Sequence, residues 1–393
     1  MTFDAVLESA ARRHASDIHL RAGQALLLRV QGTLERVPRE TSAAPSAADL
    51  DALVSRLLSP DQRERWTRTL ELDAALTLPH VGRCRASIFR QRGTTALVLR
   101  VIPAEIPALD TLGLPASVAA LADLSRGLVL VTGATGSGKS TTLAALVDRI
   151  NQTRPVHILT IEDPVEFLHR DARALVSQRE VGLDVPTYAA GLKSALRQDP
   201  DVILLGELRD RDTIETALIA AETGHLVLST LHTLDAPETV NRIVSVFEPH
   251  HQPQIRVQLA RVLRATVTQR LLPRADGHGR VLAAELLVTT PYIRDCITDR
   301  DKTALLPAAI VAGASEYGMQ SFDQSILQLC QTGRVTVDEA LRWVTNVDEF
   351  QMRLRGITPG SAASSGGAGP TAATATPTPA ATKSSPGITR FGS

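Results

Sequence analysis

The sequence predicts an α/β protein built from two domains and a tail of biased composition. Its 393 residues are more than a single domain usually needs, and 44% of them are hydrophobic against 21% charged, as in a folded globular chain. Between residues 128 and 231, four short apolar segments alternate with helical stretches, which is the pattern of a buried parallel sheet. The residues from 357 to 393 are, by contrast, almost entirely Ala, Gly, Pro, Ser and Thr.

The first 103 residues predict a small α+β domain. Helical periodicity is expected over 4–14 and again near 46–68. The segments with strand composition are 17–23, 26–32, 71–78, 83–90 and 95–102. We therefore expect a domain over 1–103. An interdomain linker is expected over 104–115, where prolines and a glycine interrupt the pattern.

Residues 116–356 predict a second domain around a parallel sheet. Its apolar strands are expected at 128–133, 157–163, 202–207 and 226–231, and its helices near 138–151, 187–197, 211–222 and 237–247. Further helices and two strand-like runs follow between about 250 and 355. The tail 357–393 has too little apolar surface to offset the entropy of ordering, so we expect it to be disordered.

The charge balance argues against a nucleic-acid partner. Lys and Arg together number 42, as do Asp and Glu, and aromatic residues make up only 3% of the chain. A dedicated DNA or RNA binder usually presents a basic field and aromatic side chains on which bases stack. We therefore expect no nucleic acid among the partners.

The cysteines and the N-terminus predict a cytoplasmic location. Cys84, Cys296 and Cys330 lie too far apart for a zinc motif and are odd in number for a disulfide framework. Asp4 and Glu8 stand where a signal peptide would carry basic and then apolar residues, and no uncharged stretch approaches the ~18 residues of a membrane span.

A phosphate-binding loop is predicted where strand 128–133 meets the helix after it. The sequence there satisfies GxxxxGK[ST] in the strand, loop, helix context that the motif requires. Backbone N–H groups and the helix N-terminus would hold phosphate oxygens, Lys139 would reach the β and γ phosphates, and Ser140 would ligate Mg²⁺. The predicted nucleotide-binding residues of this loop are Gly133, Ala134, Thr135, Gly136, Ser137, Gly138, Lys139, Ser140 and Thr141.

Acidic residues follow two further strands. Glu162, Asp163 and Glu166 come at the end of strand 157–163, and Glu207 ends strand 202–207. In an open parallel sheet ligands bind beyond the carboxyl ends of the strands, so these groups are expected to face the nucleotide and its metal. Glu207 suits support of Mg²⁺ through water, and a carboxylate close to the attacking water could act as a general base. The alternative is that they are solvated loop charges, and it is strongest for Glu162.

Two histidines bracket strand 226–231. His225 and His232 are seven residues apart, which puts them on opposite faces of an extended strand and argues against a shared metal. Each could instead be a core histidine that hydrogen-bonds a backbone carbonyl. His232 lies past the strand end, where the phosphate loop opens.

Four motifs in order, GATGSGKSTT, IEDPVEF, DPDVILLGELRD and AETGHLVLSTLHT, resemble those of the secretion and type IV pilus motor ATPases, and most of all the PilT/PilU retraction group. The resemblance extends over roughly residues 1–355. It implies a PAS-like N-terminal domain, a RecA-like P-loop ATPase domain and a hexameric ring that binds ATP and Mg²⁺ between domains and subunits. It also implies that Glu166 is the general base, that Glu207 supports Mg²⁺ and that His225 and His232 sense the γ phosphate.

The segment GRCRASIFRQRG resembles the family strand whose arginines reach the phosphates from the N-terminal domain. Alternation puts Arg83 and Arg85 on one side and Arg90 and Arg92 on the other. We expect Arg83 and Arg85 to contact phosphate. A solvated basic strand face is the alternative.

Two absences indicate retraction within this group. Assembly and type II secretion motors usually carry a four-cysteine zinc motif and a longer N-terminal extension, and this chain has neither. The segment TPYIRDCITD replaces the AIRNL-like segment of the retraction motors, which favours an accessory, PilU-like motor. Its expected partners are a pilus platform protein of the inner membrane and a paralogous retraction ATPase. A nucleotide-dependent scaffold, an assembly or type II secretion ATPase, and a RecA-like helicase or DNA-packaging motor are the alternatives.

Overall fold

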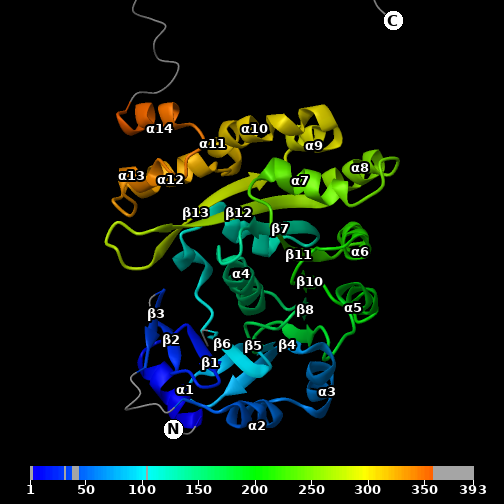
Figure 1. Cartoon of the computed structure of the whole chain (residues 1–393). Helices are drawn as coiled ribbons and strands as arrows, with labels where there is room; N and C mark the ends of the chain where they lie inside the picture. Colours follow the sequence, from blue (N-terminus) through cyan, green and yellow to red (C-terminus); the bar gives the residue numbers. More distant parts are fainter. Residues whose placement is uncertain (1–2, 31, 38–43, 103–104, 357–393) are drawn as a thin grey trace, which may run out of the picture.

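The structure is a computed structural model that describes residues 3–30, 32–37, 44–102 and 105–356. Its chain forms two sheets, one of six strands and one of seven. The six-stranded sheet lies at one end of the molecule and helices α9 to α14 at the other, with the seven-stranded sheet between them (Figure 1). Within the described ranges, no helix is both long enough and apolar enough to cross a bilayer. The predicted tail 357–393 lies outside the described residues.

The N-terminal unit is an antiparallel sheet with helices packed on one face. Its strands follow the order β3-β2-β1-β6-β5-β4. Burial alternates along β4, so one face packs against the helices and the other does not. Leu7, Leu50 and Trp66 of the three helices share one core with Ile88 and Leu99 of the sheet. The elements are α1 (Phe3–Arg12), β1 (Asp17–Arg21), β2 (Leu27–Val30), β3 (Thr33–Arg36), α2 (Ala47–Leu57), α3 (Pro60–Thr69), β4 (Glu71–Leu78), β5 (Gly82–Gln91) and β6 (Thr94–Val101).

The second unit is built on a mostly parallel sheet of order β13-β12-β7-β11-β10-β8-β9. All neighbours from β12 to β9 are parallel, and only β13 runs antiparallel. The strands are β7 (Gly127–Gly133), β8 (His157–Glu162), β9 (Leu175–Glu180), β10 (Val202–Leu205), β11 (Leu226–Leu231), β12 (Leu263–Pro273) and β13 (Arg280–Val288). Because these strands are parallel, their carboxyl ends meet at one edge of the sheet.

Helices cover both faces of this sheet, which explains why its central strands are apolar throughout. Leu128 and Leu130 of β7 belong to the core beneath α5 to α9, whereas Val129 and Val131 belong to the core beneath α4. The helices are α4 (Lys139–Thr153), α5 (Tyr188–Ala195), α6 (Arg211–Glu222), α7 (Ala236–Ser245), α8 (Gln252–Val262), α9 (Pro291–Thr298), α10 (Leu306–Ala312), α11 (Ala314–Tyr317), α12 (Phe322–Gln331), α13 (Val337–Ala340) and α14 (Val347–Leu354), with 3₁₀ turns η1 (Leu109–Leu112), η2 (Ala116–Asp123) and η3 (Arg300–Leu305).

The structure adds three details to the predicted elements. The helical stretches expected near 46–68 are two helices, because Ser59 caps α3 by accepting from the backbone N–H of Gln62 and Pro60 occupies the first helical position. Strands β3 and β9 were not predicted, since both are short and mostly polar. The segment TPYIRDCITD forms α9 with Ile293, Cys296 and Ile297 buried.

Candidate functional site

The phosphate loop joins the end of β7 to the start of α4. Gly133, Gly136 and Gly138 have φ angles of 136°, 78° and 96°, in the region that side chains disfavour. Gly138 is also the residue that precedes the first turn of α4. The loop therefore needs glycine at these positions, and it brings its backbone to the N-terminus of a 15-residue helix.

Gln269 of β12 supports this loop from below and was not predicted. Its side-chain Nε2 donates to Thr142 Oγ1 at 2.6 Å, and both residues are buried. A Cβ atom at Gly133 would lie 2.5 Å from the carbonyl oxygen of Gln269. No sequence motif marks this glutamine, because its role depends on β12 lying beside β7.

Lys139 is folded back onto the loop. Its Nζ donates to the carbonyl oxygens of Gly133 at 2.8 Å and Ala134 at 3.0 Å. Burial lowers the pKa of Lys139, and the negative charges of Glu207 and Glu166 oppose that shift. The lysine and both predicted catalytic carboxylates therefore lie within electrostatic reach of one another.

The side chains at the loop fit a phosphate group with a bound divalent cation. The buried Ser137 Oγ has no hydrogen-bond partner among the residues that the structure describes. Ser140 is exposed at the start of α4 and lines a cavity of about 50 Å³ together with Thr160, Glu162, Gly206 and Thr230. Hydroxyl and carboxylate oxygens are the ligands that Mg²⁺ prefers.

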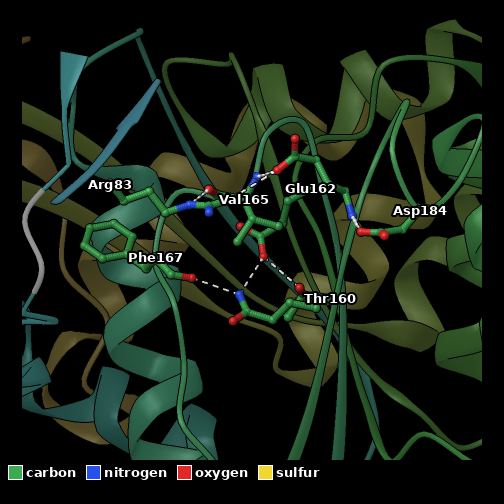
Figure 2. A network of polar contacts seen from close by, with 8 residues as sticks. Arg83, Thr160, Glu162, Val165, Phe167 and Asp184 are labelled. Carbon is green, nitrogen blue, oxygen red and sulfur yellow. Dashed lines mark hydrogen bonds and ion pairs between the residues drawn. The ribbon is translucent and has the colours of Figure 1, made fainter. Parts of the chain in front are cut away.

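Glu162 lies at the end of β8 inside this cavity. Thr160 Oγ1 donates to its Oε1 at 2.7 Å, and Gln178 Nε2 donates at 3.3 Å while also donating to the carbonyl oxygen of Phe167 at 2.8 Å (Figure 2). Burial raises the pKa of Glu162 to about 7. Asp163, by contrast, is exposed. Of these two secondary predictions, only Glu162 lines the cavity.

Each carboxylate oxygen of Glu207 lies beside a basic side chain. Its Oε2 lies 2.8 Å from Nε of Arg209, and its Oε1 lies 3.4 Å from Nε2 of His232. The glutamate follows β10 and the histidine follows β11, and these strands are parallel neighbours. His232 is therefore at the predicted edge of the sheet, beside a predicted catalytic residue.

His225 is not at this edge: within one chain it lies away from the phosphate loop, and its role in sensing phosphate stays a prediction. It precedes β11, and its carbonyl oxygen accepts from the N–H of Gly127 at the start of β7. The phosphate loop begins at the far end of the same strand, roughly 20 Å away at ~3.3 Å per residue. The Nδ1 of His225 donates to the carbonyl oxygen of Ala220 at 2.9 Å, which makes it a cap on α6.

The two N-terminal arginines have different partners, and neither partner is the phosphate loop. Arg83 of β5 donates from Nε to the carbonyl oxygen of Val165 at 2.9 Å and from Nη2 to Glu180 Oε2 at 3.3 Å. Arg85 pairs with Asp73 on the adjacent strand at 3.5 Å. Arg83 was expected to reach the nucleotide site from the N-terminal domain. It does reach the acidic segment of the site, but its partners there are protein groups. In this structure Arg85 stays on the N-terminal sheet.

Tyr188 and Glu180 are two further residues that the sequence did not indicate. The hydroxyl of Tyr188 lies against Gly206, where a Cβ atom would be only 2.7 Å from it. Burial and the carboxylates of Asp163 and Glu207 raise the pKa of Tyr188. Glu180 ends β9, so the strand-end rule that found Glu162 would have found it had β9 been predicted.

A strand, a glycine-rich loop and a helix N-terminus that meet acidic strand ends at one edge of a parallel sheet define a P-loop nucleotide-binding protein. The chain belongs to the family of type II/IV secretion system proteins, whose family model matches residues 1–353. The fold class and the resemblance read from the four motifs are thereby confirmed.

Individual relatives support the same assignment. The chain is 41% identical over 343 residues to the "Type IV pilus retractation ATPase PilT" of Pseudomonas aeruginosa, which covers 86% of this chain and 97% of the relative. It is 37% identical over 355 residues to the "Type IV pilus ATPase PilU" of the same organism, covering 90% and 92%. The crystal structure of the pilus retraction motor PilT with bound ADP matches with a TM-score of 0.80 at 41% identity, covering 89% of this chain and 98% of that one.

Proposed function

We propose that this protein hydrolyses ATP to ADP and phosphate and uses the reaction to power retraction of a type IV pilus. The observation that carries the proposal is the phosphate loop itself, where Lys139 is folded onto the loop backbone beside a cavity lined by Ser140 and Glu162, and where the charges of Glu166 and Glu207 act on the lysine. The names of its relatives, a pilus retraction ATPase and a pilus ATPase, give the reaction its mechanical purpose.

The residues divide the chemistry among them. The backbone of Gly133 to Thr141 and the Nζ of Lys139 bind the phosphates and stabilise the charge that develops on them. Mg²⁺, held by Ser140 and through water by Glu207, would neutralise charge on the β and γ phosphates. Glu166 accepts a proton from the attacking water as the bond from γ-phosphorus to the leaving oxygen breaks. Among the described residues nothing hydrogen-bonds the Glu166 carboxylate, so it is available for this role.

The assembly that supports this role is a hexamer at the cytoplasmic face of the inner membrane. There it would act on a pilus platform protein, either alone or as an accessory to a paralogous retraction ATPase. ATP biases a subunit toward one domain arrangement only by binding that arrangement more tightly, and a shift from 1:99 to 99:1 takes about 5.5 kcal/mol. Pilus assembly or type II secretion is the second candidate.

Three measurements test the proposal. In a steady-state assay with ATP and Mg²⁺, Glu166→Gln should bind ATP nearly as well as the wild type but hydrolyse it very slowly; normal turnover in this variant would refute the base assignment. Deletion of the gene should leave surface pili present but unable to shorten, and loss of pili would instead identify an assembly motor. If the pure ring hydrolyses ATP only with a paralogous motor present, the protein is an accessory subunit.

A further inference from the structure

Arg83 connects the N-terminal sheet to the backbone next to Glu166. It lies on β5, and its guanidinium reaches the segment that follows β8 (Figure 2). Nε donates to the carbonyl oxygen of Val165 at 2.9 Å. That carbonyl belongs to the peptide group that joins Val165 to Glu166, so the arginine binds the link immediately before the proposed base.

The same peptide group also faces the end of β8. Its N–H, that of Glu166, is close enough to the carboxylate of Glu162 to oppose the rise in the pKa of that carboxyl. The peptide group before Glu166 is therefore bonded at its oxygen to the N-terminal unit, and its nitrogen side lies near Glu162. A shift of Arg83 would have to break or strain its bond to the Val165 carbonyl.

Glu180 completes this arrangement. Its Oε2 accepts from Nη2 of Arg83 at 3.3 Å and from the backbone N–H of Val165 at 3.2 Å. The two charged side chains are only 20% and 9% exposed. Glu180 is anchored in turn, because it pairs with Glu162 across β8 and β9 and its own N–H donates to Asp184 Oδ2 at 2.8 Å.

We propose that Glu180 is a positioning residue for the hydrolysis: by holding Arg83 and the N–H of Val165 at once, it places Glu166 to take the proton of the attacking water only when the N-terminal sheet is docked. This inference rests on the proposed role of Glu166. Arg83 then acts within its own chain: through its contacts, the position of the proposed base Glu166 depends on the position of the N-terminal sheet. Because a displacement of about 1 Å can cost about 100-fold in rate, a modest movement of β5 is sufficient.

Burial of Glu180 is consistent with this role. Burial raises its pKa, whereas Arg83 and the Val165 N–H oppose the rise. A buried carboxylate left without its cation is costly, so Glu180 and Arg83 should stay together. The competing explanation is a purely structural ion pair between the two units, which would affect stability and leave turnover of the folded enzyme unchanged.

The test compares Glu180→Gln, Arg83→Gln and the double variant in the assembled full-length protein. Glu180→Gln keeps an oxygen for the Val165 N–H and loses only the charge that binds Arg83. We expect kcat to fall about 10- to 100-fold in each single variant, with KM and the affinity for ATP within about twofold of wild type. The double variant should be no slower than the slower single one, because Glu180 is proposed to act through Arg83, which Arg83→Gln already removes.

Controls separate this inference from the proposed function. Arg12→Gln removes an exposed ion pair with Glu8 on α1, far along the chain from the site, and should keep wild-type kcat. If Glu180→Gln and Arg83→Gln lower the melting temperature but not kcat, or raise KM alone, the positioning role is wrong. If Glu166→Gln stays active in the same assay, the base assignment fails first. If Glu166→Gln is inactive and Glu180→Gln turns over normally, only the positioning role is lost.

Discussion

His232 Nε2 lies 3.4 Å from Oε1 of Glu207, which joins two motifs that the sequence separates by 25 positions. The contact exists because β10 and β11 are parallel neighbours in register, with Leu205 opposite Ser229. Each strand therefore delivers its next side chains to the same edge. Since Arg209 holds the other carboxylate oxygen at 2.8 Å, the direction of Glu207 is fixed from two sides.

We predict that Glu207 and His232 act as a unit. Glu207→Gln should lower kcat about 100-fold and His232→Gln about tenfold, because supporting groups of a metal or phosphate site typically contribute 10- to 100-fold. The double variant should lose less than the product of the two factors, since each single change already breaks the shared contact. Steady-state ATPase rates at saturating Mg²⁺ measure this, and multiplicative losses would contradict it.

The glycines of the phosphate loop should differ in how they tolerate alanine. Gly133 and Gly136 both have positive φ, but a Cβ at Gly133 would lie 2.5 Å from the Gln269 carbonyl oxygen, whereas nothing lies within 4 Å at Gly136. Gly136→Ala should cost about 1–2 kcal/mol of unfolding free energy from its backbone conformation alone. Gly133→Ala should cost more than that, because backbone atoms must also move. Urea unfolding of the nucleotide-free protein compares them, and equal losses would show that the contact with Gln269 does not matter.

The sequence predicted the phosphate loop and the acidic strand ends because each depends on local order: a strand, a turn of glycines and a helix. Contacts that depend on tertiary packing could not be predicted from the sequence. Gln269 matters only because β12 lies beside β7, and the partner of Arg83 depends on how the two units dock. His225 is different. It precedes its strand, so the rule that ligands bind at carboxyl ends already placed it away from the phosphates.

His225 should therefore affect stability and not catalysis. Replacing it with alanine removes the hydrogen bond from Nδ1 to the Ala220 carbonyl at the end of α6, worth about 0.5–1.5 kcal/mol. We expect a lower melting temperature with kcat and KM of wild type well below that temperature. The exposed His278 provides a matched control, and His278→Ala should change neither property. A large fall in kcat for His225→Ala would restore a functional role, which a neighbouring subunit would then have to explain.

Glu285 makes the free energy of unfolding depend on pH. It lies on β13, is only 6% exposed, and accepts from the backbone N–H of Ala236 at the start of α7 at 3.0 Å. Burial raises its pKa to about 7, the nearby carboxylates of Asp235 and Asp323 act in the same direction, and Arg270 opposes them. The folded protein therefore holds a proton on Glu285 at pH values where the unfolded chain, with a pKa of 4.5, has lost it.

The sign of the effect follows from proton linkage. Between pH 4.5 and about 7 the folded state binds more protons than the unfolded state, so the stability that Glu285 contributes is complete below pH 4.5 and is lost as the pH rises through about 7. Glu285→Gln keeps an acceptor for the Ala236 N–H and cannot ionise. The free energy of unfolding of the variant, relative to that of the wild type, should rise by up to about 3 kcal/mol between pH 4.5 and 8, at ~1.4 kcal/mol per pKa unit. Urea unfolding across this range, with the exposed Glu215→Gln as control, measures the gain, and a difference that stays constant with pH would rule out a protonated Glu285.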